Sequence, residues 1–113
     1  MDRLENYRSI IKQLLEDYRV QGLESDDPGT DRIVIADATT DNYLLLNVGW
    51  WQGKRITGAT LHLRLLHGKI QIEEDWTEKG ITADLLQAGI SRDEIVLAFH
   101  SPETRKYTEF ATA

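Results

Sequence analysis

The stretch Tyr43–Trp76, YLLLNVGWWQGKRITGATLHLRLLHGKIQIEEDW, decides the fold of this chain. It reads as three consecutive strands joined by two tight turns, at Gln52-Gly53 and His67-Gly68. Two-residue turns fix the pairing of the strands on either side, so the register can be written out. Because side chains alternate between the two faces of a sheet, one face becomes mostly apolar and the other mostly polar. This pattern predicts an antiparallel sheet that is covered on one side only.

The predicted register places most apolar residues of the three strands on one face. Across the first turn, the predicted pairs are Trp50–Arg55, Val48–Thr57, Leu46–Ala59 and Leu44–Leu61. Across the second turn, they are Leu65–Ile70, Leu63–Ile72, Leu61–Glu74 and Ala59–Trp76. On the polar face, His62 is expected opposite Glu73, and Arg64 opposite Gln71. Four apolar residues interrupt that polar face: Leu45, Trp51, Ile56 and Leu66.

Residues 2–20 are predicted to form an amphipathic helix that covers the apolar face of the sheet. Asp2 is the expected N-cap, with Glu5 three residues further on. The acidic segment 24–31 follows, and it lacks the ligand spacing of a calcium loop, so we expect a solvated loop there. The apolar stripe of the helix has three- and four-residue spacing and consists of Leu4, Tyr7, Ile11, Leu14, Leu15 and Tyr18.

The remaining segments are shorter. Residues 32–37 form a short run rich in β-branched side chains, which predicts a strand beside Tyr43–Trp51. Its register is open, so either Ile33 and Ile35 or Val34 and Ala36 lie in the core. A helix is expected over 81–88, ended by Gly89, and then a single turn over 91–94. We interpret the apolar run 95–99 as a buried strand, although its length does not distinguish strand from helix. Ser101 and Pro102 are expected to begin a short helix.

These elements predict an α+β fold. An N-terminal helix packs on one face of a mainly antiparallel sheet of about four strands in meander order, and short helices and a short C-terminal strand follow. The chain of 113 residues is expected to form one domain, 1–113, with a single modest core.

Composition narrows the function classes. No apolar run approaches the ~20 residues of a membrane helix, and the first residues lack the pattern of a secretory signal. The chain has no cysteine, so we expect neither disulfides nor thiolate metal sites, and a cytoplasmic location. The net charge of −6 disfavours direct nucleic acid binding, which needs clustered Lys and Arg, and favours a basic protein partner.

The sequence contains no recognisable set of catalytic residues. The chain has no hydrolase elbow, phosphate loop or dinucleotide fingerprint. Its three histidines are too dispersed for a zinc site, and helix capping accounts for Ser101 beside His100. We therefore expect no catalytic, cofactor-binding or metal-binding residues and no enzymatic activity.

A binding surface is the better-founded expectation. Large apolar side chains on an otherwise polar face are typical of a contact with a partner or a second subunit. We expect a homo-oligomer, most simply a two-fold dimer, with Trp51 or its polar-face neighbours at the contact. The predicted partner-binding residues are Trp51, Ile56, His62, Arg64, Leu66, Glu73, His100 and Arg105.

Several motifs resemble one known family over nearly the whole chain. They are Leu4-Glu5-x-Tyr7-Arg8, Val48-Gly49-Trp50, Gly53-Lys54-Arg55, Gly58, His62, Gly68-Lys69-Ile70, Thr77-Glu78-x-Gly80-Ile81, Asp93-x-Ile95-Val96-Leu97-Ala98-Phe99-His100-Ser101-Pro102 and Arg105-x-x-Thr108-Glu109-Phe110-Ala111. Together they resemble the XisI family, the fdxN-element excision controlling factors of cyanobacteria. The departures are Trp51 after the Val-Gly-Trp motif and Ser91, where the family often has proline.

The resemblance implies a non-catalytic accessory protein. Members of the family act with a partner, XisH, in controlling the site-specific excision of a DNA element by a recombinase. XisH resembles a nuclease-type domain, so the resemblance implies docking on an XisH-like subunit. Two alternatives stay open: a direct DNA-binding excision factor, and a small ligand-binding or hydrolase domain that uses the face of His62 and Glu73, with His100.

Overall fold

The computed structural model describes residues 2–22 and 29–113 of the chain. The carboxylates at 24–27, which were considered as a calcium loop, lie outside these residues. The described elements are α1 (Arg3–Gly22), β1 (Thr30–Asp37), β2 (Asn42–Trp51), β3 (Lys54–Leu66), β4 (Lys69–Asp75), α2 (Ile81–Gln87), the 3₁₀ turn η1 (Arg92–Glu94), β5 (Ile95–Leu97) and α3 (Pro102–Arg105).

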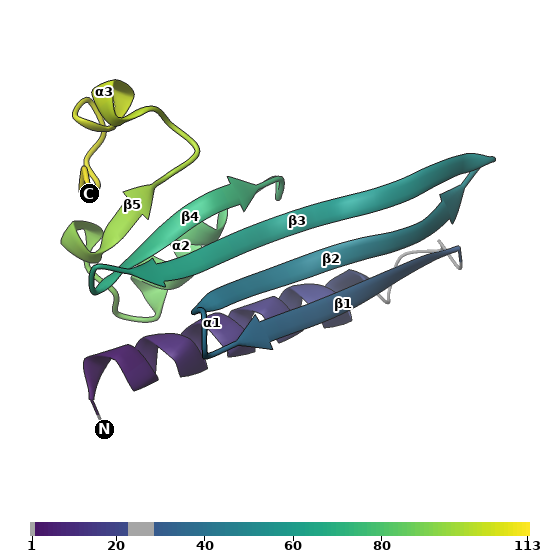
Figure 1. Cartoon of the computed structure of the whole chain (residues 1–113), viewed down its shortest axis with the longest axis horizontal. Helices are drawn as coiled ribbons and strands as arrows, with labels where there is room; N and C mark the ends of the chain where they lie inside the picture. Colours follow the sequence, from purple (N-terminus) through teal and green to yellow (C-terminus); the bar gives the residue numbers. More distant parts are fainter. Residues whose placement is uncertain (1, 23–28) are drawn as a thin grey trace.

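In the described chain, these strands form one sheet in the order β1-β2-β3-β4-β5 (Figure 1). The first four strands are antiparallel neighbours, and β5 pairs with β4 in parallel. The predicted α+β fold is thus confirmed, including the meander. The apolar run 95–99 is a strand only as far as Leu97, since Ala98 and Phe99 lie in a turn.

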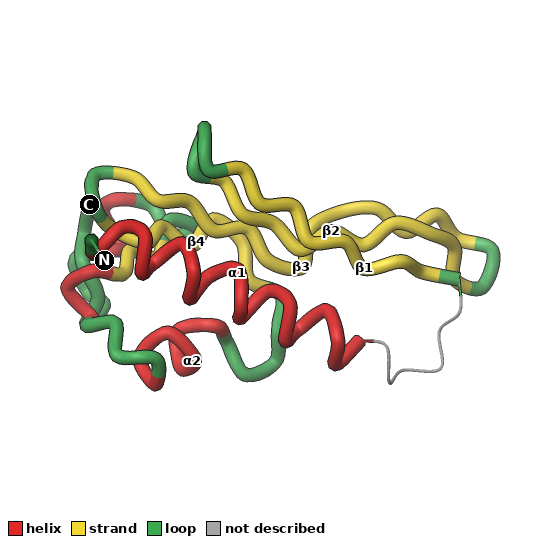
Figure 2. Tube along the Cα trace, turned by 90° about the horizontal axis from the view of Figure 1, so that it is seen from below, coloured by secondary structure: helices red, strands yellow, loops and turns green. Residues whose placement is uncertain are grey.

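Helix α1 lies along one face of the sheet, and α2 lies on the same side (Figure 2). Ile11 and Leu15 of α1 are fully buried in the cluster that contains Leu63 and Ile72. The predicted cap is present, because the backbone N–H of Glu5 donates to Oδ1 of Asp2 at 3.0 Å. We call the side of the sheet that α1 and α2 cover the helix face, and the opposite side the open face.

The predicted register holds next to both turns and fails further from them. Pairing shifts by one residue between Leu45 and Leu46, where the extra residue is Thr60 in β3. It shifts again beyond Leu63, where the extra residue is Glu73 in β4. The predicted pairs Leu44–Leu61, Leu61–Glu74 and Ala59–Trp76 are therefore wrong. In the structure, Leu44 pairs with His62, Leu45 with Leu61, and Leu61 with Asp75.

The β-bulges change which apolar residues enter the core. An extra residue in one strand shifts the alternation of its side chains relative to the neighbouring strand. Tyr43 and Leu45 are consequently fully buried on the helix face. Leu44, Leu46, Val48 and Trp50, which were expected in the core, lie on the open face instead.

Exposure of the tryptophans follows from the same bulges. Trp50 is 58% exposed and Trp76 is 76% exposed, so their predicted place in the core is wrong. In β1, Val34 pairs with Leu45 and packs against the core. Ile33 and Ile35 lie on the open face, each 41% exposed. The alternative with Val34 on the core side is therefore the correct one.

The turns and short helices agree with the sequence. Both residues of the β2–β3 turn and of the β3–β4 turn have positive φ, including Gln52 at 49° and His67 at 55°, as a type I′ turn requires. Helix α2 is followed by Gly89, whose φ is 97°. The Ser101 side chain accepts from the N–H of Thr104 at the start of α3, which confirms that cap. In the described residues, no helix has both the length and the apolar character that crossing a membrane requires.

Candidate partner-binding surfaces

The residues predicted to bind a partner are distributed over three parts of the molecule. Trp51 and Ile56 lie on the helix face near the end of the β2–β3 hairpin, whereas His62, Arg64 and Leu66 lie on the open face. His100 and Arg105 belong to the C-terminal segment. The structure therefore does not bring the predicted set together into one surface.

The predicted pairing of His62 with Glu73 is wrong. Glu73 is the extra residue of the second bulge, so His62 lies opposite Glu74. The Nε2 atom of His62 is 2.9 Å from Oδ1 of Asn42, and Glu73 is 3.7 Å from the Arg64 guanidinium. The expected pair of Arg64 with Gln71 is present.

Arg105 has a structural role in the C-terminal segment. Its guanidinium donates to the carbonyl oxygens of His100 at 2.9 Å and Ala98 at 3.1 Å. The His100 ring contacts that of Phe99, with centroids 4.6 Å apart. A backbone hydrogen bond from Ala111 to Ile95 at 2.9 Å places the end of this segment along β5. Arg105 thus holds a chain segment that closes one edge of the sheet.

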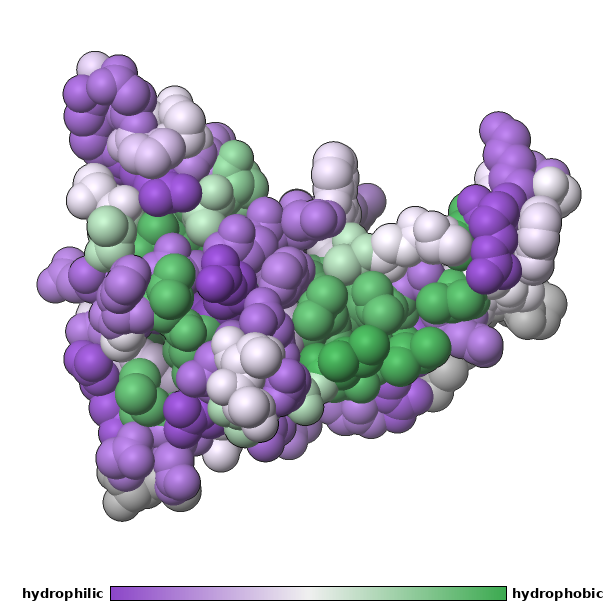
Figure 3. Space-filling model, in the orientation of Figure 1, coloured by the Kyte–Doolittle hydropathy of each residue, from purple (hydrophilic) through white to green (hydrophobic). Residues whose placement is uncertain are grey.

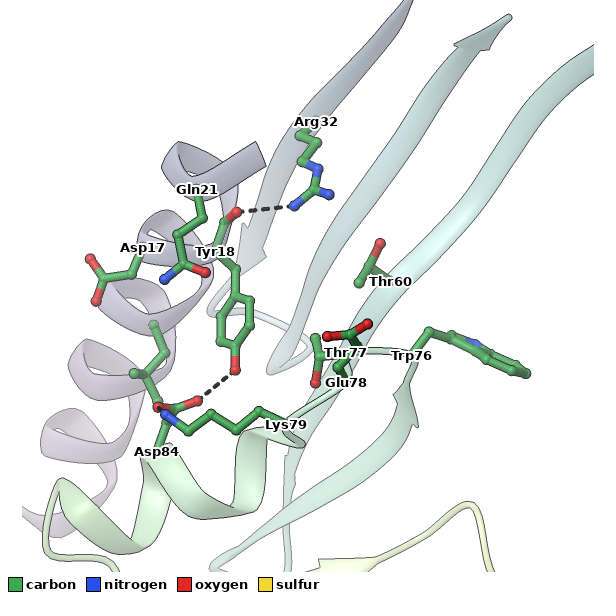
Figure 4. Close-up of a pocket in the computed structure, with 11 residues that line it drawn as sticks. Asp17, Tyr18, Gln21, Arg32, Thr60, Trp76, Thr77, Glu78, Lys79 and Asp84 are labelled. Carbon is green, nitrogen blue, oxygen red and sulfur yellow. Dashed lines mark hydrogen bonds and ion pairs between the residues drawn. The ribbon is translucent and has the colours of Figure 1, made fainter. Parts of the chain in front are cut away.

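A groove of about 540 Å³ opens on the helix side, between α1, the strands and the start of α2 (Figure 4). Its walls come from segments that are far apart in sequence, and the ring of Trp76 projects away from the other lining side chains (Figure 4). The lining residues are Leu14, Asp17, Tyr18, Gln21, Arg32, Thr60, Trp76, Thr77, Glu78, Lys79 and Asp84.

Hydrogen bonds join the walls of this groove. The Tyr18 hydroxyl donates to Asp84 at 2.6 Å, and the Lys79 ammonium donates to the same carboxylate at 2.8 Å. Burial acts to raise the pKa of Asp84, but the hydrogen bonds from Lys79 and Tyr18 outweigh it, so the pKa is lowered. Burial, together with the bond to Asp84, raises the pKa of Tyr18. The groove therefore presents an ionised Asp84 and a neutral Tyr18 near neutral pH.

Asp75 sets the position of the groove's lower wall. Its carboxylate accepts from the N–H of Ile81 at 2.7 Å and from the N–H of Thr77 at 3.0 Å. It therefore caps α2 from six residues upstream, where Gly80 has no side chain to do so. Sequence reasoning missed this cap, although an Asp two residues before Thr77 is a recognised turn-forming arrangement.

The lining of the groove combines charged, hydroxyl and aromatic side chains. The described lining has three acidic and two basic side chains and no His, Cys or Ser, so it holds neither a Ser–His nor a Cys–His pair. His62, Glu73 and His100 do not line it. Among the described residues, no group of His, Cys, Asp or Glu side chains could hold a metal ion.

The second candidate surface is the open face of β1, β2 and β3. Figure 3 views the molecule from this side and shows a continuous apolar patch over the three strands. Polar and charged side chains surround the patch. Sequence reasoning assigned part of it to the core, because the bulges were not recognised. Its apolar members are Ile33, Ile35, Leu44, Leu46 and Val48.

The fold described above, a helix on one face of a five-stranded sheet, is that of XisI-like proteins. It superposes on the crystal structure of a XisI-like protein from Anabaena variabilis ATCC 29413 with a TM-score of 0.91 and 29% identity, covering 98% of this chain and 100% of that chain. It also matches the fdxN element excision controlling factor XisI from the same organism, with a TM-score of 0.83 and 39% identity over 99% of this chain and 100% of that chain.

The family model described as XisI protein matches residues 1–112. The chain therefore belongs to the XisI family. No curated protein matches it.

Proposed function

We propose that this protein is a non-catalytic accessory factor that controls the site-specific excision of a DNA element. The observation that supports this proposal is the match to the fdxN element excision controlling factor XisI, at 39% identity over 99% of the chain. The groove lining agrees with it, because its chemistry suits binding. The proposed place of action is the cytoplasm.

The proposed mode of action is protein binding, with an XisH-like nuclease-type subunit as the partner. A protein that handles DNA carries basic surface, and this chain has a net charge of −6. Opposite charges accelerate the encounter of two proteins, and buried aromatic side chains then slow their separation. We also propose self-association into a dimer.

The groove is the proposed docking site for a basic segment of the XisH-like subunit. Asp17 and Glu78 bring negative charge to its lining, and the exposed Trp76 lies at the end opposite Asp17 (Figure 4). Exposed tryptophans are frequent anchors of protein interfaces, because they bury a large area at a small entropic cost. Trp76 therefore combines with the acidic lining to suit a basic segment that carries an apolar residue.

Binding kinetics with a groove variant test this docking site. We expect Trp76→Ala to raise the dissociation rate from the purified XisH-like subunit by about 30-fold or more, as loss of a hot-spot residue does, and to change the association rate little. Tyr107→Ala is the matched control, since Tyr107 is an exposed aromatic of the C-terminal segment. Equal effects of the two substitutions would show that the groove is not the site.

A further inference from the structure

The open face of β1, β2 and β3 carries an apolar centre between an acidic edge and a basic edge. The centre is the patch of Ile33, Ile35, Leu44, Leu46 and Val48 visible in Figure 3. It is uncommon for a sheet face to expose so many branched apolar side chains without a covering layer. In the described chain, both α1 and α2 lie on the other side (Figure 2).

The charged residues at the rim follow a pattern. Asp31 and Asp37 stand at the two ends of β1 and share the open face with Ile33 and Ile35, since side chains two residues apart point the same way. Arg55 and Arg64 stand on the same face of β3. Arg64 has Glu73 at 3.7 Å, and Asp37 accepts from the N–H of Thr39 and the hydroxyl of Thr40, so a partner's charges would add to these contacts. Asp37, Asn42 and Arg64 form one row across the three strands, and Arg55 lies two residue pairs beyond the row of Asp31.

We infer that this face binds the open face of a second copy of the same chain, about a two-fold axis that runs along β2. That axis places β1 of one copy over β3 of the other, with the two β2 strands stacked. Asp37 then faces Arg64 of the second copy, and Asp31 lies over Thr57, two residues from Arg55 along β3, which brings the long Arg55 side chain toward it. Stacked sheets lie ~10 Å apart with strands within ~30° of each other.

Charge selects this axis over the other two-fold arrangement. An axis across the strands would stack β1 on β1 in the opposite direction. Asp31 would then face Asp37, and Arg55 would face Arg64, so that every rim contact would be between like charges. Like charges at an interface oppose association, which leaves the axis along β2.

The dimensions of the face suit a dimer contact. Strand β1 has eight residues, so at ~3.3 Å per residue and ~4.8 Å between strands the three-stranded face measures roughly 26 by 14 Å. This footprint of roughly 370 Å² lies in the ~300–600 Å² range of large surface patches but below the ~800 Å² that each partner of a stable interface buries, so it is the centre of a wider contact that includes the charged rim. Trp50, which lies over the hairpin end with Arg55 5.4 Å from its ring, extends the contact.

The inference deepens the proposed self-association and does not depend on the groove. If the protein is a monomer, this interface is wrong, whereas binding of the XisH-like subunit through the groove is unaffected. If the subunit fails to bind, the role in excision control is weakened, whereas the dimer is unaffected.

Sedimentation equilibrium of the full chain tests the surface. We expect a dimer, and we expect Ile33→Lys to raise the dimer dissociation constant on the order of 100-fold, because it places a charge within an apolar contact. Trp51→Lys, on the helix face of the same hairpin, is the control and should leave the dimer intact. Circular dichroism checks that both variants fold. A monomeric wild type, or a dimer lost only with Trp51→Lys, would overturn the inference.

Charge reversal at exposed rim residues tests the orientation of the two-fold axis. Because these side chains are exposed, the substitutions should leave the fold intact. Asp31→Arg and Arg55→Glu each create like-charge contacts in their own homodimers, so each should dissociate about 10-fold more readily. Mixed in equal amounts, the two variants should form a heterodimer near wild-type affinity, because both rim contacts then regain opposite charges. A mixture no tighter than the separate variants would overturn the axis.

A different partner for this face would also overturn the proposal. That outcome would be a wild-type protein that is a monomer and binds the XisH-like subunit, together with loss of that binding in Ile33→Lys.

Discussion

At the scale of single residues, one ion pair connects α1 to the first hairpin. The Arg8 guanidinium donates to both carboxylate oxygens of Asp41, at 2.8 and 3.2 Å. The Tyr43 hydroxyl donates to the same carboxylate at 2.9 Å. The bond from Arg8 lowers the pKa of Asp41, while burial and the bond to Asp41 raise the pKa of Tyr43 to about 12. This cluster of hydrogen bonds holds α1 against the sheet at the polar edge of the contact between them.

The depressed pKa of Asp41 predicts a pH dependence of stability. A carboxyl group with a lower pKa in the folded state stabilises it above the unfolded pKa of about 4, and this contribution is lost as the pH falls through the folded pKa. Asp41→Asn should therefore lower the free energy of unfolding by about 1–3 kcal/mol at pH 7. The deficit should shrink as the pH falls below about 4.

Urea denaturation at a series of pH values measures this effect. Asp93→Asn, at an exposed position of η1, is the matched control and should show no such trend. A deficit of Asp41→Asn that stayed constant from pH 7 to below the folded pKa would contradict the role of the ionised carboxylate.

Gly49 is a position in β2 where the fold leaves no room for a side chain. A Cβ at this position would lie 2.0 Å from the carbonyl oxygen of Gly29. That oxygen accepts a backbone hydrogen bond from Trp50 at 2.9 Å, so it cannot move away without losing the bond. Glycine is therefore required at this point of the Val48-Gly49-Trp50 motif, where the chain enters β1 beside β2.

At the scale of the elements, packing of α1 on the sheet depends on its innermost side chains. Leu15 is fully buried in the core, whereas Leu14 is only partly buried beside the groove. Leu15→Ala should lower the free energy of unfolding by about 2–5 kcal/mol. Val20→Ala, at an exposed position of the same helix, should change it by about 0.5 kcal/mol or less. Equal stabilities of the two variants in urea would contradict the packing of α1.

The sequence predicts the strand pairing correctly close to a turn and less well further from it. The hairpin turns determine the pairs next to them, such as Trp50–Arg55 and Leu65–Ile70, and the structure has both. The extra residues Thr60 and Glu73 carry no local signal, because neither is the glycine that often marks a bulge. Their positions are therefore seen only in the strand pairing of the folded chain.

The same limit explains what was missed of the candidate surfaces. The sequence predicted that apolar side chains would lie on both faces, but one unrecognised bulge exchanges the faces of a whole strand segment. Leu46 and Val48 were therefore expected in the core and lie on the open face. The groove joins Tyr18, Arg32 and Asp84, residues from three distant segments that only the fold brings together.

At the scale of the whole molecule, the protein presents two surfaces on opposite sides of one sheet. The groove lies on the helix side (Figure 4), and the apolar patch lies on the open face (Figure 3). Because the two do not overlap, a dimer formed through the open face leaves both of its grooves accessible. A dimer of this kind would hold two XisH-like subunits.

Binding of the purified XisH-like subunit at two salt concentrations, measured beside a duplex DNA control, tests the central proposal most directly. We expect the subunit to bind, with an association rate that falls as salt rises, because charge attraction is screened beyond ~10 Å at 0.1 M salt. We expect no specific binding of duplex DNA by the chain alone at physiological salt. Failure of the subunit to bind, together with specific and salt-sensitive binding of DNA by the isolated chain, would contradict the account.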